Sequence, residues 1–287
     1  MSYFIVLMTT ADEKLPENCS ATDLEEKAIA AWEHRLAKYT RNIPSLESDI
    51  NGLKEYYYRS VLSGLVCIWE NDDFTVNPHF TTSGMDGGAM CSYLWDIAGY
   101  ASNMTCLMLD SEVMPIARQM VNIDLENFYA YAPGGAGVGV RYSYSPSAFT
   151  NLVTSICKFQ GPDADMFNAA KKLILNDEKN SKQSNHLIDY GVQRNLLEMR
   201  GAGWEHFVVS PNAERIWCLE RLAELGEYVN EAQEELAAWR RQAAAIKQAI
   251  QTQLWDDDVR WFKSGYPHGY NDYVYSVQVS AGWGVFR

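Results

Sequence analysis

The sequence predicts an all-α fold built from paired helices, and three observations carry this prediction. Helix-start signals precede long amphipathic segments, as at Thr22-Asp-Leu-Glu25 and Ser210-Pro211. Short turns alternate with long polar loops between these segments, which is typical of helical hairpins. Apolar residues recur at helical spacing, and the clearest stripe has steps of 3, 4, 3, 4 and 4: Leu236, Trp239, Ala243, Ile246, Ile250, Leu254.

The first half of the chain predicts two helical pairs. The capping box at Thr22 opens a helix over 22–40, which Asn42-Ile-Pro44 ends, and a second helix follows over 48–69. Residues 71–92 are polar loop. The next pair is predicted over 93–109 and 111–122.

The second half predicts two further pairs. A glycine-rich loop at 133–139 precedes helices over 146–159 and 163–177. The last pair spans 210–225 and 230–254, with Gly226 as a left-handed cap and Asn230 as the N-cap of the final helix.

The N-terminal segment differs from the rest. Residues 3–10 are β-branched and aromatic and predict a strand with no partner strand nearby. We therefore expect residues 1–15 to be the remainder of a preceding β domain, and residues 20–287 to form the helical domain.

Net charge and hydropathy limit the classes of binding partner that we expect. The net charge of −13 argues against nucleic acid and anionic membranes, which bind concentrated Lys and Arg. No apolar run approaches the roughly 18 residues of a membrane span. The N-terminus lacks a signal-peptide pattern, which favours the cytoplasm without fixing the compartment. The sequence leaves the oligomeric state open.

Several kinds of chemistry lack their motifs. The six cysteines include no CxxC and no His/Cys cluster with zinc spacing, so we expect buried reduced thiols and neither metal nor cofactor. Gly134–Gly139 fits no nucleotide-binding fingerprint and is expected to be a rim loop. No Gly-x-Ser-x-Gly elbow supports acyl transfer. Aromatic residues, at 13%, include nine Trp and seventeen Tyr, enough to line a pocket whose rings stack on sugars.

Four stretches together resemble one family. They are Gly88–Asp96, Tyr142–Phe149 with Gly161-Pro-Asp163, Asn185–Glu205, and Asn212–Trp255. In this order they are similar to the six-hairpin glycoside hydrolases, which fold as an (α/α)6 toroid and include trehalase-like and processing α-glucosidase-like enzymes. The resemblance covers roughly residues 20–275. It implies an inverting hydrolase of α-glucosides or related saccharides, with an oligosaccharide or glycoside as substrate.

The chain departs from this family in its length. A closed toroid needs six hairpins, whereas the sequence predicts about four and the start of a fifth near Tyr266–Tyr275. The resemblance places the catalytic base beyond residue 287 and identifies the first strand as the end of a β-sandwich. We therefore expect an incomplete toroid from a larger enzyme.

Asp189 is the predicted general acid. Glycoside cleavage uses one carboxylic acid to protonate the leaving oxygen and one carboxylate to activate water. Asp189 follows the apolar pair Leu187-Ile188, where desolvation would raise its pKa. An N-cap for a helix over 192–199 is the structural alternative, and the sequence leaves both interpretations open.

Neighbouring side chains complete the predicted pocket. Glu205 is the second catalytic candidate, with Trp204 and His206 beside it as pocket wall. Tyr190 and Glu198 are further candidates for substrate binding, although Glu198 also fits the end of a short helix.

Trp95 and Asp96 resemble the Trp-Asp pair that opens the family's second hairpin. The ring would stack on a sugar face and the carboxylate would accept sugar hydroxyls. A purely structural Asp96, bonded to backbone at the start of a buried hairpin, is the alternative.

Two other functions stay open. A sugar epimerase or isomerase on a similar toroid needs paired histidines in the pocket, and His186 and His206 lie in the right loop. A carbohydrate-binding fragment without its base is the other alternative.

Overall fold

A computed structural model describes residues 20–82, 90–191, 205–267 and 274–275. The predicted strand at 3–10 lies outside the described residues. The chain divides into two compact units, Met1–Leu65 and Val66–Arg287, and each is described separately.

The described residues of the first unit form two helices. Helix α1 (Ala21–Thr40) begins with a capping box formed by Ser20 and Asp23, two residues before the predicted one. Helix α2 (Leu53–Cys67) begins five residues later than expected. Helix α1 is exposed along most of its length, and Tyr39 is its buried residue. The packing of α1 on α2 as a hairpin therefore stays a prediction.

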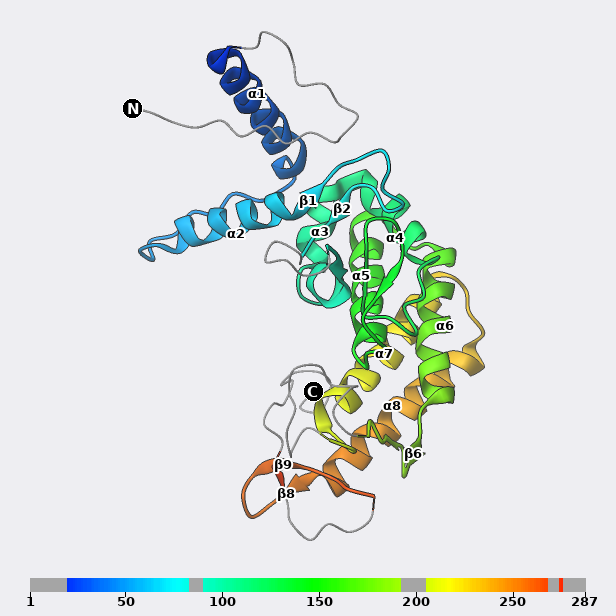
Figure 1. Cartoon of the computed structure of the whole chain (residues 1–287). Coiled ribbons are helices and arrows are strands. Elements are labelled where there is room, and N and C mark those ends of the chain that lie inside the picture. Colours follow the sequence, from blue (N-terminus) through cyan, green and yellow to red (C-terminus); the bar gives the residue numbers. More distant parts are fainter. Residues whose placement is uncertain (1–19, 83–89, 192–204, 268–273, 276–287) are drawn as a thin grey trace. The chain divides into compact units, whose positions relative to one another are not determined.

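The second unit is built mainly from helices (Figure 1). Most of them agree within a few residues with the predicted segments, and the predicted helix over 93–109 is divided into a π-helix and α3. The described helices are the π-helix η1 (Trp95–Tyr100), α3 (Ser102–Leu109), the short 3₁₀ helix η2 (Asp110–Glu112), α4 (Val113–Met120), α5 (Ser145–Gln160), α6 (Ala164–Asn180), α7 (Val209–Tyr228) and α8 (Gln233–Gln253).

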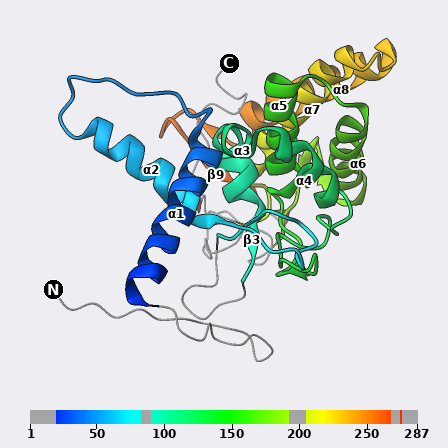
Figure 2. The same cartoon turned by 90° about the horizontal axis from the view of Figure 1, so that it is seen from above.

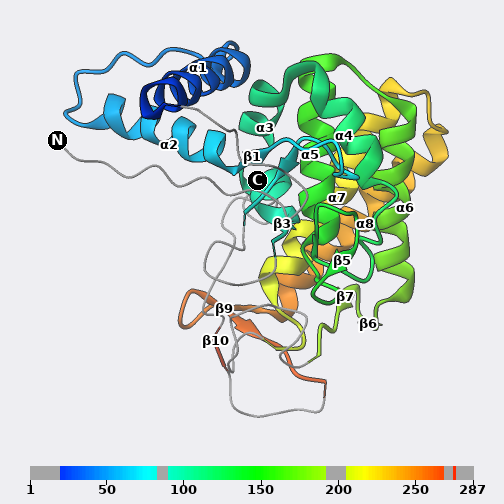
Figure 3. The same ribbon diagram turned by 45° about the horizontal axis from the view of Figure 1, so that its top comes forward.

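These helices form two layers. Helix α5 packs between α3 and α7, as the view in Figure 2 shows, while α4 and α6 cover α5 and α8 covers α7 (Figure 3). Helices α5 and α7 bury most of their residues, including many serines and threonines of α5. Helices α6 and α8 bury one stripe each, as amphipathic outer helices do. This double layer confirms the predicted all-α fold.

Within the described ranges, four small sheets connect the helices. The sequence did not indicate them, because most of their strands have two residues. In the first sheet, β1 (Ile68–Trp69) pairs with β2 (His79–Phe80). In the second, β4 (Ala130–Tyr131) lies between β3 (Ser92–Tyr93) and β5 (Gly137–Val138). In the third, β6 (Gln183–Ser184) pairs with β7 (Leu187–Ile188). In the fourth, β9 (Trp261–Ser264) lies between β8 (Trp255–Asp256) and β10 (Val274–Tyr275).

Gly226 does not cap α7, contrary to the prediction. The helix continues to Tyr228, and Gly226 lies inside it against α8. A Cβ atom at this position would lie 2.6 Å from Cδ2 of Leu236, so the glycine permits close approach of the two helices. Helix α8 has Ala232 at its N-cap instead of the predicted Asn230, which adopts a left-handed φ of 59°.

The described cysteines are free thiols, as expected. Three of the five are buried, and Cys67 and Cys157 are partly exposed. Among the described residues, no helix combines the length and apolarity that a membrane span requires.

Candidate functional site

The β6–β7 hairpin places Asp189 at the start of α7. Its two-residue turn, Asn185-His186, has positive φ at both positions (47° and 70°), as a type I′ turn requires. The Asp189 N–H donates to Lys182 O at 2.8 Å, which continues the ladder beyond β7. Asp189 therefore follows directly from a fixed strand.

The Asp189 carboxyl group is buried and fully engaged. Its side chain is 4% exposed. Oδ1 accepts from the Gly191 N–H at 2.9 Å and lies 2.8 Å from Nδ1 of His206, while Oδ2 lies 3.1 Å from Nζ of Lys182. The predicted N-cap role for a helix over 192–199 falls outside the described residues.

The expected rise in the Asp189 pKa is wrong in sign. Burial does raise the pKa, as the apolar neighbours suggested. The hydrogen bonds from Gly191, His206 and Lys182 outweigh burial, and the pKa of Asp189 is lowered from its ordinary value. Asp189 is therefore an anion at neutral pH.

His206 and Glu205 lie beside this carboxylate. The backbone of His206 pairs with the turn after Asp189, accepting from Tyr190 N at 3.0 Å and donating to Gly191 O at 2.8 Å. The His206 ring lies 5.3 Å from the ring of Tyr266, whose hydroxyl is 3.5 Å from Oε2 of Glu205. The structure thus brings Asp189, Tyr190, Glu205 and His206 together. Trp204 and Glu198 lie outside the described residues.

Trp95 belongs to a cluster of five aromatic rings. It stacks on Tyr93 with centroids 4.9 Å apart and meets the edge of Tyr142 at 5.0 Å. The ring of Tyr129 contacts those of Tyr93, Trp95 and Tyr142, and the ring of Tyr142 lies 5.0 Å from that of Tyr144. Asp96 is half-buried in the first turn of η1. We call Tyr93, Trp95, Tyr129, Tyr142 and Tyr144 the aromatic cluster.

Tyr144 joins the aromatic cluster to the Asp189 group. Its hydroxyl donates to Ser210 Oγ at 3.0 Å, which links the start of α5 to the start of α7. Its ring packs against the buried group of Ile188, Tyr190 and Val208. Trp95 and Asp189, 94 positions apart in the chain, therefore belong to one continuous set of contacts.

Sequence reasoning missed Tyr144, Tyr266 and Lys182 as members of this site. One signal was available for Tyr144. Helices α5 and α7 both open with Ser-Pro-x-Ala, at 145–148 and 210–213, which marks two equivalent helix starts. Lys182 and Tyr266 have no comparable signal, because they reach the site through the β6–β7 hairpin and the pairing of Phe207 with Gly265.

Two buried groups lie beneath the site on α7. Glu214 is 7% exposed and accepts from Ser147 Oγ at 2.6 Å. Burial raises the pKa of Glu214 to about 8, because the carboxylate loses its hydrating water. The hydrogen bond from Ser147 offsets this rise only in part. The neighbouring Arg215 forms a bidentate pair with Glu178, with N–O distances of 2.6 and 2.7 Å.

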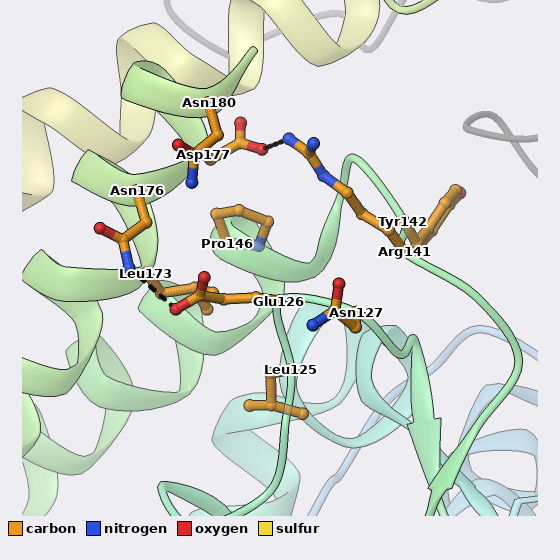
Figure 4. Close-up of a pocket in the computed structure, with 10 residues that line it drawn as sticks. All are labelled: Leu125, Glu126, Asn127, Arg141, Tyr142, Pro146, Leu173, Asn176, Asp177 and Asn180. Carbon is orange, nitrogen blue, oxygen red and sulfur yellow. Dashed lines mark hydrogen bonds and ion pairs between the residues drawn. The ribbon is translucent and has the colours of Figure 1, made fainter.

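A polar hollow of about 80 Å³ lies between the end of α6 and the start of α5 (Figure 4). Its charged groups bind one another: Arg141 pairs with Asp177, and the Asn176 amide donates to Glu126 at 2.9 Å. Tyr142 lines both this hollow and the aromatic cluster.

His79 is a structural histidine. It is buried, with Nδ1 2.9 Å from Thr81 Oγ1 and Nε2 3.4 Å from Tyr131 O, and burial lowers its pKa. No cluster of potential metal ligands occurs among the described residues.

The fold is similar to that of known enzymes. The chain aligns with a rhamnosidase from Klebsiella oxytoca with rhamnose bound, with a TM-score of 0.59 and 13% identity over 77% of this chain and 42% of that one. It also aligns with a sugar epimerase from a ruminal bacterium, with a TM-score of 0.47 and 12% identity over 80% and 61%. No protein-family model and no curated protein matches the sequence.

The first alignment assigns the fold as part of an α/α toroid. The chain spans less than half the length of the rhamnosidase that it matches.

Proposed function

We propose that this chain is the site-bearing part of a sugar-processing enzyme that cleaves a glycosidic bond. The observation that supports this proposal is the continuous set of contacts from the aromatic cluster to Asp189 and Glu205 at the starts of α5 and α7. Aromatic faces suit the apolar faces of sugar rings, and a carboxyl group beside them can donate the proton that cleavage of a glycosidic bond requires. The likeness of the fold to a rhamnosidase agrees with this choice.

The different surroundings of the Asp189 and Glu205 carboxyl groups suggest a different role for each. Asp189 carries a lowered pKa and three partners, so it acts as an ionised carboxylate that orients His206. Glu205, half-buried with its carboxyl oxygen 3.5 Å from the Tyr266 hydroxyl, is then the proton donor. Trp95 and Asp96 hold the sugar, with Tyr190 and the predicted Trp204 and Glu198 completing the wall.

Substitution of each carboxyl group tests this distribution. Asp189→Asn and Glu205→Gln in the active protein should each lower kcat by a factor of at least about 100 while leaving sugar affinity nearly unchanged. Glu220→Gln, on α7, is the matched control. Near-normal kcat in Asp189→Asn would remove Asp189 from the mechanism.

The Asp189–His206 contact favours one other function, a sugar epimerase or isomerase. Nδ1–H of His206, held 2.8 Å from a buried carboxylate, leaves Nε2 free to accept a proton from a sugar carbon. The pair would then perform proton transfer instead of hydrolysis.

Incubation in D₂O separates these functions. A panel of aryl glycosides and free sugars is supplied, and released phenol and sugar deuteration are measured. An isomerase exchanges a carbon-bound hydrogen beside the carbonyl for deuterium, whereas a hydrolase releases phenol without exchange. Sugar binding without either reaction would identify a binding fragment.

A further inference from the structure

Two side chains on α7, Asn212 and Arg215, connect the helical core to the loop that carries Asp189. Both are buried, with exposures of 0% and 6%. We propose that Asn212, held in place by Arg215, is a positioning residue that fixes the Asp189 carboxylate against Gly191 and His206. This inference rests on the proposed function for its catalytic meaning and on the contacts below for its geometry.

The side-chain amide of Asn212 makes two hydrogen bonds to the backbone of Ile188 in β7, as the backbone of a paired strand would. Its Oδ1 accepts from the Ile188 N–H at 2.9 Å, and its Nδ2 donates to Ile188 O at 3.2 Å. A second donation, to Val208 O at 2.8 Å, ties the same amide to the residue that precedes α7. One side chain therefore fixes the backbone on both sides of the Asp189–His206 contact.

Arg215 holds this amide from below. Nη1 of Arg215 donates to Asn212 Oδ1 at 2.7 Å and to His186 O, in the hairpin turn, at 2.9 Å. The Nε and Nη2 edge of the guanidinium makes the bidentate pair with Glu178 of α6. Gln242 of α8 donates to the same carboxylate at 2.7 Å, so three helices anchor the hairpin.

The consequence for Asp189 is geometric. Its position follows from Ile188 by one peptide unit, and its partners Gly191 and His206 are set by the turn at Tyr190 and by Val208. Displacement of Ile188 or Val208 by a fraction of an ångström would lengthen the hydrogen bonds to the carboxylate, and hydrogen bonds weaken steeply with poor geometry. A residue that acts through another in this way supports the first residue without touching substrate.

The test measures the Asp189 carboxyl group directly. The 287-residue protein is labelled with [13Cγ]aspartate, Asp189→Asn identifies the resonance, and its titration is followed by NMR. Asn212→Ala should move the pKa of Asp189 upward, toward the ordinary value of about 3.9. Arg215→Lys, which keeps the charge but loses the fork on Glu178, should move it in the same direction and serves if Asn212→Ala does not fold.

Asn151→Ala is the matched control. Asn151 lies on α5, and its amide donates to Ala98 O at 3.0 Å and Gly99 O at 2.9 Å, away from the hairpin. It should destabilise the protein while leaving the pKa of Asp189 unchanged. Where acid unfolds the protein first, exchange of the Gly191 N–H at neutral pH gives the same comparison, with at least about tenfold faster exchange in Asn212→Ala.

Two results overturn the proposal. One is a pKa of Asp189 that is unchanged in both Asn212→Ala and Arg215→Lys. The other is a shift of this pKa in Asn151→Ala that equals the shift in Asn212→Ala. Neither depends on turnover, so the outcome is separate from that of the proposed function. If the proposed sugar-processing activity proves wrong, Asn212 would still be the residue that positions the Asp189–His206 pair, whose function would then be a different one.

Discussion

At the scale of single residues, Glu214 provides a pH-dependent test of the core. Its folded pKa of about 8 exceeds the value of about 4.3 expected in an unfolded chain. Below that lower value its contribution to stability is fully present, and the contribution is lost as the pH rises toward 8. The free energy of unfolding of the native sequence should therefore fall between pH 5 and pH 8.

Glu214→Gln should remove this dependence. The amide fits the same space and carries no charge at any pH. Between pH 5 and pH 8 the native sequence should therefore lose about 3–4 kcal/mol more stability than the variant. Urea denaturation at the two pH values measures the difference. Glu220→Gln, half-buried on the same helix, should keep the pH slope of the native sequence, and an identical slope in Glu214→Gln would contradict the assignment of Glu214.

The site shows what single-residue reasoning can reach. Asp189, Glu205, His206 and Tyr190 were grouped because they lie close together in the sequence. The structure brings Asp189 and Tyr190 into contact with His206, while Glu205 contacts Tyr266, whose ring lies against His206. The pKa of Asp189 was predicted with the wrong sign, because the flanking Leu187-Ile188 is visible in the sequence whereas the donors are not. Lys182 and His206 reach the carboxylate through backbone pairing that no local pattern encodes.

At the scale of elements, the β6–β7 hairpin carries a conformation that suits glycine. His186 has a φ of 70°, which costs a residue with a Cβ about 1–2 kcal/mol. His186→Gly should therefore raise the free energy of unfolding by roughly 0.5–1 kcal/mol after the flexibility of glycine in the unfolded chain is subtracted. Chemical denaturation measures it, and His186→Ala, which keeps the Cβ, should show no gain.

Gly226 provides the opposite case on α7. Gly226→Ala gains up to about 1 kcal/mol of helix propensity but forces a methyl group against Leu236, at an overpacking cost of about 1–3 kcal/mol. We expect a net loss on the order of 1 kcal/mol in denaturation experiments. Gly134→Ala, where no atom lies within 4 Å of the added Cβ, is the control.

A compensating variant checks the cause of that loss. Leu236→Val removes the atom nearest the added methyl group, so the double variant should be more stable than the two separate losses imply. Additive losses would show that Leu236 is not the obstacle.

The elements themselves were predictable to different degrees. Helices α5 to α8 follow from apolar periodicity and start signals, since both are local properties. The two-residue strands and the π-helix at Trp95–Tyr100 were missed, because long-range pairing and packing against α5 decide them. The end of α7 was misplaced because a glycine that permits close packing looks the same in sequence as one that ends a helix.

At the scale of the whole molecule, the buried thiols report global unfolding. Burial raises the pKa of Cys106 to about 12, and Cys218 is 3% exposed with a raised pKa. At pH 8 the thiolate of Cys106 should be on the order of a thousandfold scarcer than that of a free cysteine. Labelling of both residues should therefore follow the denaturation curve measured by circular dichroism.

Mass spectrometry of pulse-labelled protein makes this measurement. Cys67 and Cys157, which are partly exposed, should react earlier and act as internal references. Rapid modification of Cys106 or Cys218 in native buffer would show that α3 or α7, respectively, opens locally.

The hydrogen bond between Tyr144 and Ser210 has a practical consequence for ligand discovery. It joins the starts of α5 and α7, which belong to different helical pairs, and the rings and acids around it come from distant parts of the chain. A compound bound across them would stabilise the folded form over the unfolded form, and the gain grows with the logarithm of ligand concentration divided by Kd. Screening by melting temperature would thus detect a saccharide held here even where the chain performs no turnover.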